Sequence, residues 1–338
     1  MLKEVVLIRL ILIVLLVIYH SLAPFTHAWP MPGAIEFNGE GYKIIADLAY
    51  SFMLEAFVFI SGLILGFQAR KCPERLNFKN LIGKKSRRLM LPCVIWSIIY
   101  FMLLDDRNLT PVHFFYSILN GEGHLWFLPM LFWCFVGIFL LEKTKIPKMY
   151  CLILAILIAL LPMVDLPLRI DYTMSYFVYF YCGYYLTSEN RVSKDLISNK
   201  ITLLVVFIGY LGLFCLFNYT EWPSIFESEG FIGRMTVSFF TRLGRLIYSS
   251  LGIVFIYLWA LDFSFRKNVS QNLITLSTCC FGVYIFQQYI LKSLYYHSSF
   301  CEIFGVWFPI IGALFTLSVS LLLSGIMMKS KVGRMLIG

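Results

Sequence analysis

The sequence predicts an all-α fold, namely a polytopic helix bundle embedded in a membrane with both termini in the cytoplasm. The first observation is composition: of 338 residues, 59% are apolar and 14% are charged, and the mean hydropathy is +0.79, whereas a soluble domain carries about 25% charged residues. The second is a recurring apolar window of the length that crosses a bilayer. The third is the placement of basic residues, which gather in alternate loops.

The apolar windows predict about ten membrane-spanning helices. The first window resembles a secretory signal peptide in that Lys3 precedes it. However, Arg9 interrupts it, it is longer than a usual signal-peptide core, and no small-residue cleavage site follows before residues 27–30. We therefore expect membrane-spanning helices near residues 5–25, 47–68, 89–105, 123–141, 149–165, 173–188, 201–218, 238–261, 273–292 and 304–327.

The charges give the orientation of these helices. Cytoplasmic loops carry the excess of Lys and Arg, and segment 70–88 alone carries eight basic residues. An even number of spans then places both basic ends of the chain inside, so the net charge of +9 reports orientation rather than nucleic-acid binding. The nine cysteines show neither a disulfide framework nor zinc-ligand spacing, and no metal is expected. Without internal repeats, residues 1–338 are expected to form one membrane-embedded domain.

The first predicted helix contains two ionisable residues, Arg9 and His20. They are eleven residues apart, which in an α-helix is about three turns and roughly 16 Å, so both lie on nearly the same face. Each side chain could reach the headgroups independently by snorkelling. A shared face favours a functional site instead, because ionisable groups inside a bilayer normally face a bundle interior or a water-filled path.

Glu55 in the second predicted helix needs a partner if it is buried. One interpretation is a carboxylate that orients His20 as a catalytic base. The other is a structural ion pair with Arg242 or Arg245, and the sequence leaves both open. These two arginines are three residues apart on one helix face, where they could clamp an anionic or hydroxyl-rich acceptor or bind lipid headgroups.

Two further polar groups lie at the predicted membrane surfaces. On the cytoplasmic side, a basic cluster suits a phosphate-rich ligand or anionic lipid; it consists of Lys84, Lys85, Arg87 and Arg88. On the outer side, His124 precedes Trp126 in a pattern typical of an aromatic interface anchor. The five histidines all fall in outer loops or at outer ends of spans, which places proton chemistry near that face: His20, His27, His113, His124 and His297.

Several of these segments, taken in order, resemble the integral-membrane acyltransferases of acyltransferase family 3. The resemblance spans nearly the whole chain and rests on Arg9 with His20, the run Phe57-Val58-Phe59-Ile60-Ser61-Gly62, the basic turn Lys85-Ser86-Arg87-Arg88, Gly123-His124-Leu125-Trp126-Phe127-Leu128, Tyr179 to Leu186, and Ser277 to Ile285. One departure is Gln287, where the family usually has a histidine.

The resemblance implies transfer of an acyl group, commonly acetyl, from cytoplasmic acyl-CoA to a hydroxyl of an envelope polysaccharide or glycolipid. It implies that His20 is the catalytic base with Glu55 as its orienter, or that an acyl-histidine forms. The implied donor-binding residues are Arg9, Ser61, Lys84, Lys85, Arg87 and Arg88, and the implied acceptor-binding residues are His124, Trp126, Arg242 and Arg245.

The same features allow other functions and indicate the protein's partners and cellular location. The polar residues inside the bundle could instead line the path of a transporter or lipid-glycan flippase, although no repeat supports this; a glycan polymerase would need a larger outer loop. The expected partners are membrane lipid and a glycan acceptor, not nucleic acid, and the sequence leaves the oligomeric state open. The compact design with short loops indicates the inner membrane of a bacterium.

Overall fold

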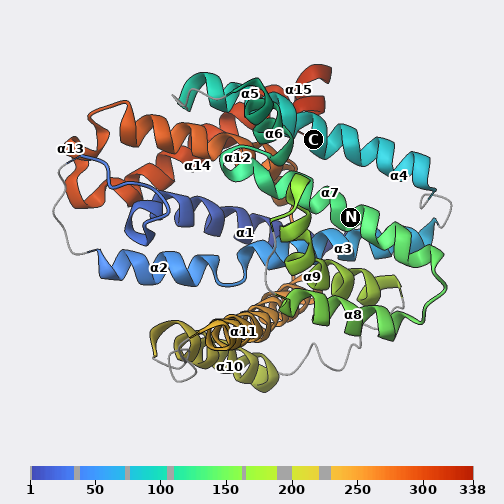
Figure 1. Cartoon of the computed structure of the whole chain (residues 1–338). Coiled ribbons are helices and arrows are strands. Elements are labelled where there is room, and N and C mark those ends of the chain that lie inside the picture. Colours follow the sequence, from blue (N-terminus) through green and yellow to red (C-terminus); the bar gives the residue numbers. More distant parts are fainter. Residues whose placement is uncertain are drawn as a thin grey trace. The chain divides into compact units, whose positions relative to one another are not determined.

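The computed structural model describes residues 2–33, 39–72, 77–104, 110–161, 165–188, 200–220 and 230–337. Every regular element in these ranges is a helix, which confirms the all-α prediction (Figure 1). The α-helices are α1 (Lys3–Ser21), α2 (Glu40–Tyr50), α3 (Met53–Lys71), α4 (Phe78–Lys85), α5 (Leu91–Leu104), α6 (Pro111–Asn120), α7 (Phe127–Lys143), α8 (Lys148–Leu160), α9 (Ile170–Ser188), α10 (Lys200–Tyr219), α11 (Phe231–Arg266), α12 (Gln271–Tyr296), α13 (Phe300–Phe304), α14 (Phe308–Met327) and α15 (Lys331–Leu336). Shorter turns are η1 (Ala23–Thr26), η4 (Gly123–Trp126), η5 (Pro167–Arg169) and η7 (Gly305–Trp307), and η3 (Ser86–Met90) is a π-helix.

Each of the ten predicted windows overlaps a helix, although residue 105 of one window and residues 162–164 of another lie outside the described ranges. Within the described ranges, eight helical stretches are long and apolar enough to cross a membrane. The predicted spans at 149–165 and 173–188 correspond to α8 and α9, which are not among the eight. Helix α8 has 13 residues, fewer than the roughly 20 that a span needs. Helix α9 carries six tyrosines and Asp171, which lower its hydropathy. Within the basic segment 70–88, residues 73–76 lie outside the described ranges.

The chain divides into two compact units, and the prediction of one domain stays a prediction. The first unit comprises Met1–Ile8, Leu54–Ile82 and Trp133–Asn268, and the second comprises Arg9–Met53, Gly83–Phe132 and Val269–Gly338. The chain passes from one unit to the other within helices α1, α3, α4 and α7.

In the first unit, α10 packs along α11, and α8 packs on α9 and α11. Helices α3 and α9 approach each other closely at glycine residues. A Cβ atom built on Gly62 would lie 2.0 Å from the carbonyl oxygen of Phe180, and one built on Gly183 would lie 2.1 Å from that of Phe59. Gly66, four residues after Gly62, meets the backbone of Tyr184 in the same way. This small-xxx-small spacing lets two membrane helices cross with backbones in contact.

In the second unit, α12 packs along α14, and α5 contacts α6, η4 and α12. The π-helix η3 has a local cause in Pro92, which follows it. Proline has no N–H group and its ring clashes with the carbonyl group four residues earlier, here that of Arg88, so regular α-helical bonding is interrupted at this point. Helix α15 packs against α5 and η3, and the indole of Trp96 donates a hydrogen bond to the Leu336 carbonyl group at 3.0 Å.

Candidate active site

Three cations gather at the N-terminal end of α1 in the second unit. Arg9 is half-buried on α1, Lys85 ends α4, and Arg88 lies in the π-helix η3. The three charges are near enough to repel one another, and the Cys280 thiol on α12 donates to the Arg9 carbonyl group at 3.9 Å. Cations held together against their repulsion form a site for an anion, because a bound anion offsets that repulsion.

Lys84 and Arg87, the other members of the predicted basic cluster, are exposed on the same segment. The structure therefore brings Arg9 of the first helix together with Lys85 and Arg88 of the basic segment. π-Helical turns frequently lie at functional sites, and here the turn carries the two arginines Arg87 and Arg88.

His20 lies near the C-terminal end of α1 and is buried, with 8% of its surface exposed. The indole of Trp29 stacks on its ring with 5.8 Å between centroids, and the His124 ring lies edge-on at 6.3 Å. Two side chains of α12, Gln287 and Lys292, also lie within interaction range. His20 thus faces the interior of the second unit and a second imidazole.

His124 is held by a turn that only glycine forms readily. Gly121 and Gly123 have φ angles of +79° and +55°, and a Cβ atom on Gly121 would lie 2.5 Å from the Leu125 backbone. The buried ring places Nε2 3.1 Å from the Ile285 carbonyl oxygen. Because a carbonyl group only accepts, Nε2 carries the proton in this bond, and Nδ1 of the neutral ring is a hydrogen-bond acceptor.

Helix α12 supplies the polar residues that the sequence prediction missed. Lys292 donates to the Tyr100 hydroxyl group at 2.5 Å, and its ammonium group lies 5.3 Å from the centre of the Trp29 ring. Gln287 and Gln288 are both buried and lie beside His20 and His124, respectively. The signal was present in the sequence as two adjacent amides and a lysine inside an apolar helix, because polar side chains in a membrane-spanning segment usually serve function.

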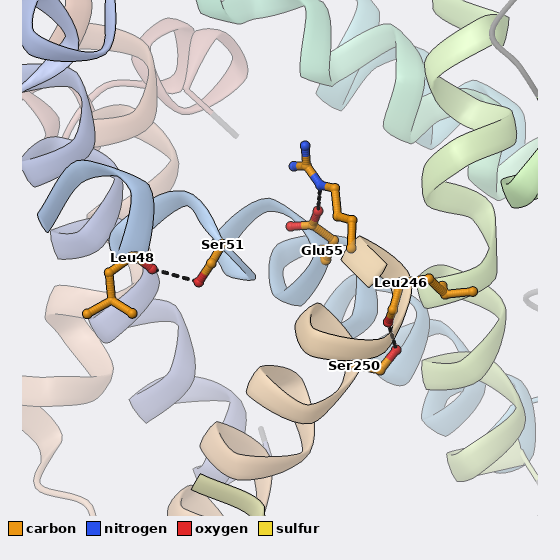
Figure 2. A network of polar contacts seen from close by, with 6 residues as sticks. Leu48, Ser51, Glu55, Leu246 and Ser250 are labelled. Atoms are coloured by element: carbon orange, nitrogen blue, oxygen red, sulfur yellow. Dashed lines mark hydrogen bonds and ion pairs between the residues drawn. The ribbon is translucent and has the colours of Figure 1, made fainter. Parts of the chain in front are cut away.

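Glu55 belongs to the first unit, where it forms an ion pair with Arg245 at 2.9 Å (Figure 2). The carboxylate is 1% exposed and the arginine 39%, and Tyr179 of α9 lies against the pair. Of the two interpretations given to Glu55, the structure therefore shows the ion pair. Arg242 donates to Ser238 in its own helix at 3.5 Å and faces the charge of Arg245.

The remaining predicted residues make local contacts. The Ser61 hydroxyl group donates to the Phe57 carbonyl group of its own helix at 2.8 Å, and the Trp126 ring meets Phe127 edge-on at 6.2 Å. The second unit therefore gathers Arg9, His20, the basic cluster and His124, whereas Glu55, Ser61, Arg242 and Arg245 belong to the first unit. In the described ranges, no group of three His, Cys, Asp or Glu side chains could hold a metal ion.

Comparison with known proteins identifies the family. A family model described as an acyltransferase domain matches residues 2–328. The chain belongs to acyltransferase family 3. No curated protein and no solved structure matches it. Membership of acyltransferase family 3 makes the protein a membrane acyltransferase and favours acyl transfer over the transport alternative.

Proposed function

We propose that the protein is an O-acyltransferase that moves an acyl group, in the first instance acetyl, from cytoplasmic acyl-CoA to a hydroxyl group of an envelope polysaccharide or glycolipid. The observation that carries the proposal is that α1 has a cluster of cations near one end and a buried imidazole near the other. Arg9, Lys85 and Arg88 form a cationic cluster at one end. His20 lies eleven residues further along, beside a second imidazole.

The cationic cluster is suited to the phosphate groups of acyl-CoA. Arginine binds phosphate oxygens with two parallel hydrogen bonds, and lysine acts as a point charge. Arg9 and Lys85 are less exposed than the neighbouring Lys84 and Arg87, so the inner cations can hold the donor while the outer ones attract it. The extended pantetheine arm then brings the thioester along α1 toward His20, roughly 16 Å away.

In the transfer step, an imidazole nitrogen of His20 takes the proton of the acceptor hydroxyl group as its oxygen bonds to the thioester carbonyl carbon. The tetrahedral oxyanion collapses, the carbon–sulfur bond breaks, and the CoA thiolate leaves and receives the proton from the imidazolium. The alternative chemistry passes the acyl group through His20 itself, so that an acyl-histidine forms first and the hydroxyl group then attacks it.

The proposal includes an orientation and a location. The cationic end of α1 is placed at the cytoplasmic face of a bacterial inner membrane, where the donor is available, and both termini lie on that side, as the basic loops indicate. The glycan acceptor approaches from the outer face, near His20, and the exposed apolar surfaces of the spanning helices contact lipid.

The test is label transfer from radiolabelled acetyl-CoA to a panel of envelope glycans by the full chain purified in detergent. His20→Ala is expected to lower turnover by at least about 100-fold, the smaller end of general-base contributions, and Arg9→Ala to raise the KM for acetyl-CoA. The matched control is His113→Ala, because His113 is exposed and bonds only Thr110 among the side-chain contacts described. Transfer that persists in His20→Ala removes the assignment of the base, and the lack of CoA-dependent transfer to every glycan contradicts the proposed function.

A further inference from the structure

The two glutamines of α12 are the most unusual polar residues in the second unit. Gln287 has 0% of its surface exposed, and neither its amide oxygen nor its amide nitrogen has a partner with hydrogen-bond geometry in the described part of the chain. Three more buried atoms have no hydrogen-bond partner in the described residues, namely the amide oxygen of Gln288, Nδ1 of His20 and Nδ1 of His124. Five such atoms from two adjacent glutamines and two facing imidazoles thus lie in one cluster.

A buried polar atom without a partner is destabilising, and a chain that retains several together normally does so for function. The neighbouring backbone does not provide the missing partners. Gln288 contacts the turn at Gly123, where a Cβ atom would lie 2.9 Å from its amide oxygen, and the Ile285 carbonyl group already binds Nε2 of His124. The cluster therefore suits a ligand that both donates and accepts hydrogen bonds.

The donor and acceptor pattern specifies the class of that ligand. The amide of Gln287 offers one donor group and one acceptor beside His20, while Nδ1 of His124 and the oxygen of Gln288 offer acceptors. A hydroxyl group donates once and accepts twice, so neighbouring hydroxyl groups of one sugar ring satisfy this set. A thioester or an acyl chain would leave the acceptors without partners.

We propose that Gln287, Gln288 and His124 form the subsite that binds the acceptor sugar through the hydroxyl groups next to the one that reacts at His20. The inference rests on the proposed function and extends it from a hydroxyl acceptor to a ring with adjacent hydroxyl groups. Lys292 adds a donor at the edge of the subsite, since it lies within interaction range of both imidazoles.

The first test uses Gln287→Leu, which removes the amide but keeps similar bulk. Because neither amide atom has a partner with hydrogen-bond geometry in the described residues, the variant is expected to melt at the same or a higher temperature than the wild type. The KM for the acceptor is expected to rise at least tenfold, and the KM for acetyl-CoA is expected not to change. Thr316→Val is the matched control, since Thr316 is also 0% exposed with a hydroxyl group that has no partner in the described ranges. It is expected to leave both KM values unchanged.

The second test identifies the bound hydroxyl groups with methyl hexopyranosides and their monodeoxy analogues as acceptors and radiolabelled acetyl-CoA as donor. For the wild type, removal of a bound hydroxyl group is expected to lower kcat/KM about tenfold, as for the loss of one hydrogen bond. For Gln287→Leu, kcat/KM is expected to differ little between the same analogue and its parent sugar.

The outcomes separate this inference from the proposed function. If the wild type transfers label and Gln287→Leu lowers kcat with an unchanged acceptor KM, Gln287 positions His20 and the subsite is wrong. If Gln287→Leu melts well below the wild type, the amide has structural partners and the subsite is likewise wrong. If the wild type transfers no label from acetyl-CoA to any sugar, the proposed function itself fails.

Discussion

Substitution of Gly62 tests the helix crossing that organises the first unit. In Gly62→Ala the new Cβ atom would lie 2.0 Å from the carbonyl oxygen of Phe180 and 2.9 Å from the carbonyl carbon of the same residue. Ordinary contact begins at 3.4 Å, so α3 and α9 must separate by up to 3.4 − 2.0 = 1.4 Å at this point. The obstacle is backbone in a regular helix, which cannot rotate away as a side chain does.

The expected cost follows from overpacking, which destabilises by about 1–3 kcal/mol for an extra methyl group in a closely packed interior. The upper end applies here because Gly183 brings α9 equally close to α3 from the other side. Against this stands a gain of about 0.5–1 kcal/mol, since alanine is a better helix residue than glycine. The net expectation is a loss of about 2–2.5 kcal/mol in the free energy of unfolding.

The assay is thermal unfolding of purified variants in one detergent, followed by intrinsic tryptophan fluorescence. The matched control is Gly212→Ala in α10, where the structure has nothing within 4 Å of the new Cβ atom and only the propensity gain of up to about 1 kcal/mol applies. Gly62→Ala is expected to melt below the wild type and Gly212→Ala at or above it. If Gly62→Ala melts as high as Gly212→Ala, the close crossing of α3 and α9 is refuted.

Two further predictions concern charged residues. Glu55→Gln leaves Arg245 without its carboxylate, and removal of one partner of a buried pair costs about 3–5 kcal/mol of stability. Solvent screening at the 39% exposed arginine reduces the expected loss to about 1–2 kcal/mol. Unfolding of the variant at the wild-type midpoint would contradict this expectation. Lys85→Ala removes one cation from the cluster around Arg9 and is expected to raise the KM for acetyl-CoA about tenfold without changing the acceptor KM. A kinetic titration at low and at high salt checks the second prediction, since the wild type should lose donor affinity more steeply with salt than the variant.

Much of the fold follows from hydropathy because a membrane requires long apolar helices, and all ten apolar windows overlap helices. The windows at 149–165 and 173–188 show the limit of this reasoning. Helix α8 is shorter than a span, and α9 is rich in tyrosine because its side chains are buried against protein, as Tyr179, Tyr181 and Tyr184 are. A hydropathy window does not distinguish a residue that faces lipid from one that faces another helix.

The candidate site, like the fold, was only partly predictable from the sequence. Arg9 and His20 stood out because charge and imidazole are rare in an apolar helix, and their shared face follows from helix geometry alone. Gln287 was visible only as a departure from the family pattern, and Gln288 not at all, since amides have no formal charge and the imidazoles beside them, His20 and His124, lie far away in the sequence. For Glu55 the sequence left Arg242 and Arg245 open as partners beside an alternative role at His20, and only packing selects Arg245, which is 190 residues away.

In the proposed function, helices α1 and α12 separate the donor site from the acceptor site along one axis. Cys280 contacts the backbone at Arg9, and Gln287 lies beside His20, so both helices advance in the same direction through the second unit. Helix α1 contains neither glycine nor proline, and these are the residues at which helices usually bend. The distance from the cationic cluster to the imidazole is therefore fixed by helix rise. If the cationic end binds phosphate and the imidazole end binds the acceptor hydroxyl group, as proposed, the donor must be long enough to reach from one to the other. Acyl-CoA, with charged phosphates at one end and a neutral thioester at the other, has that form.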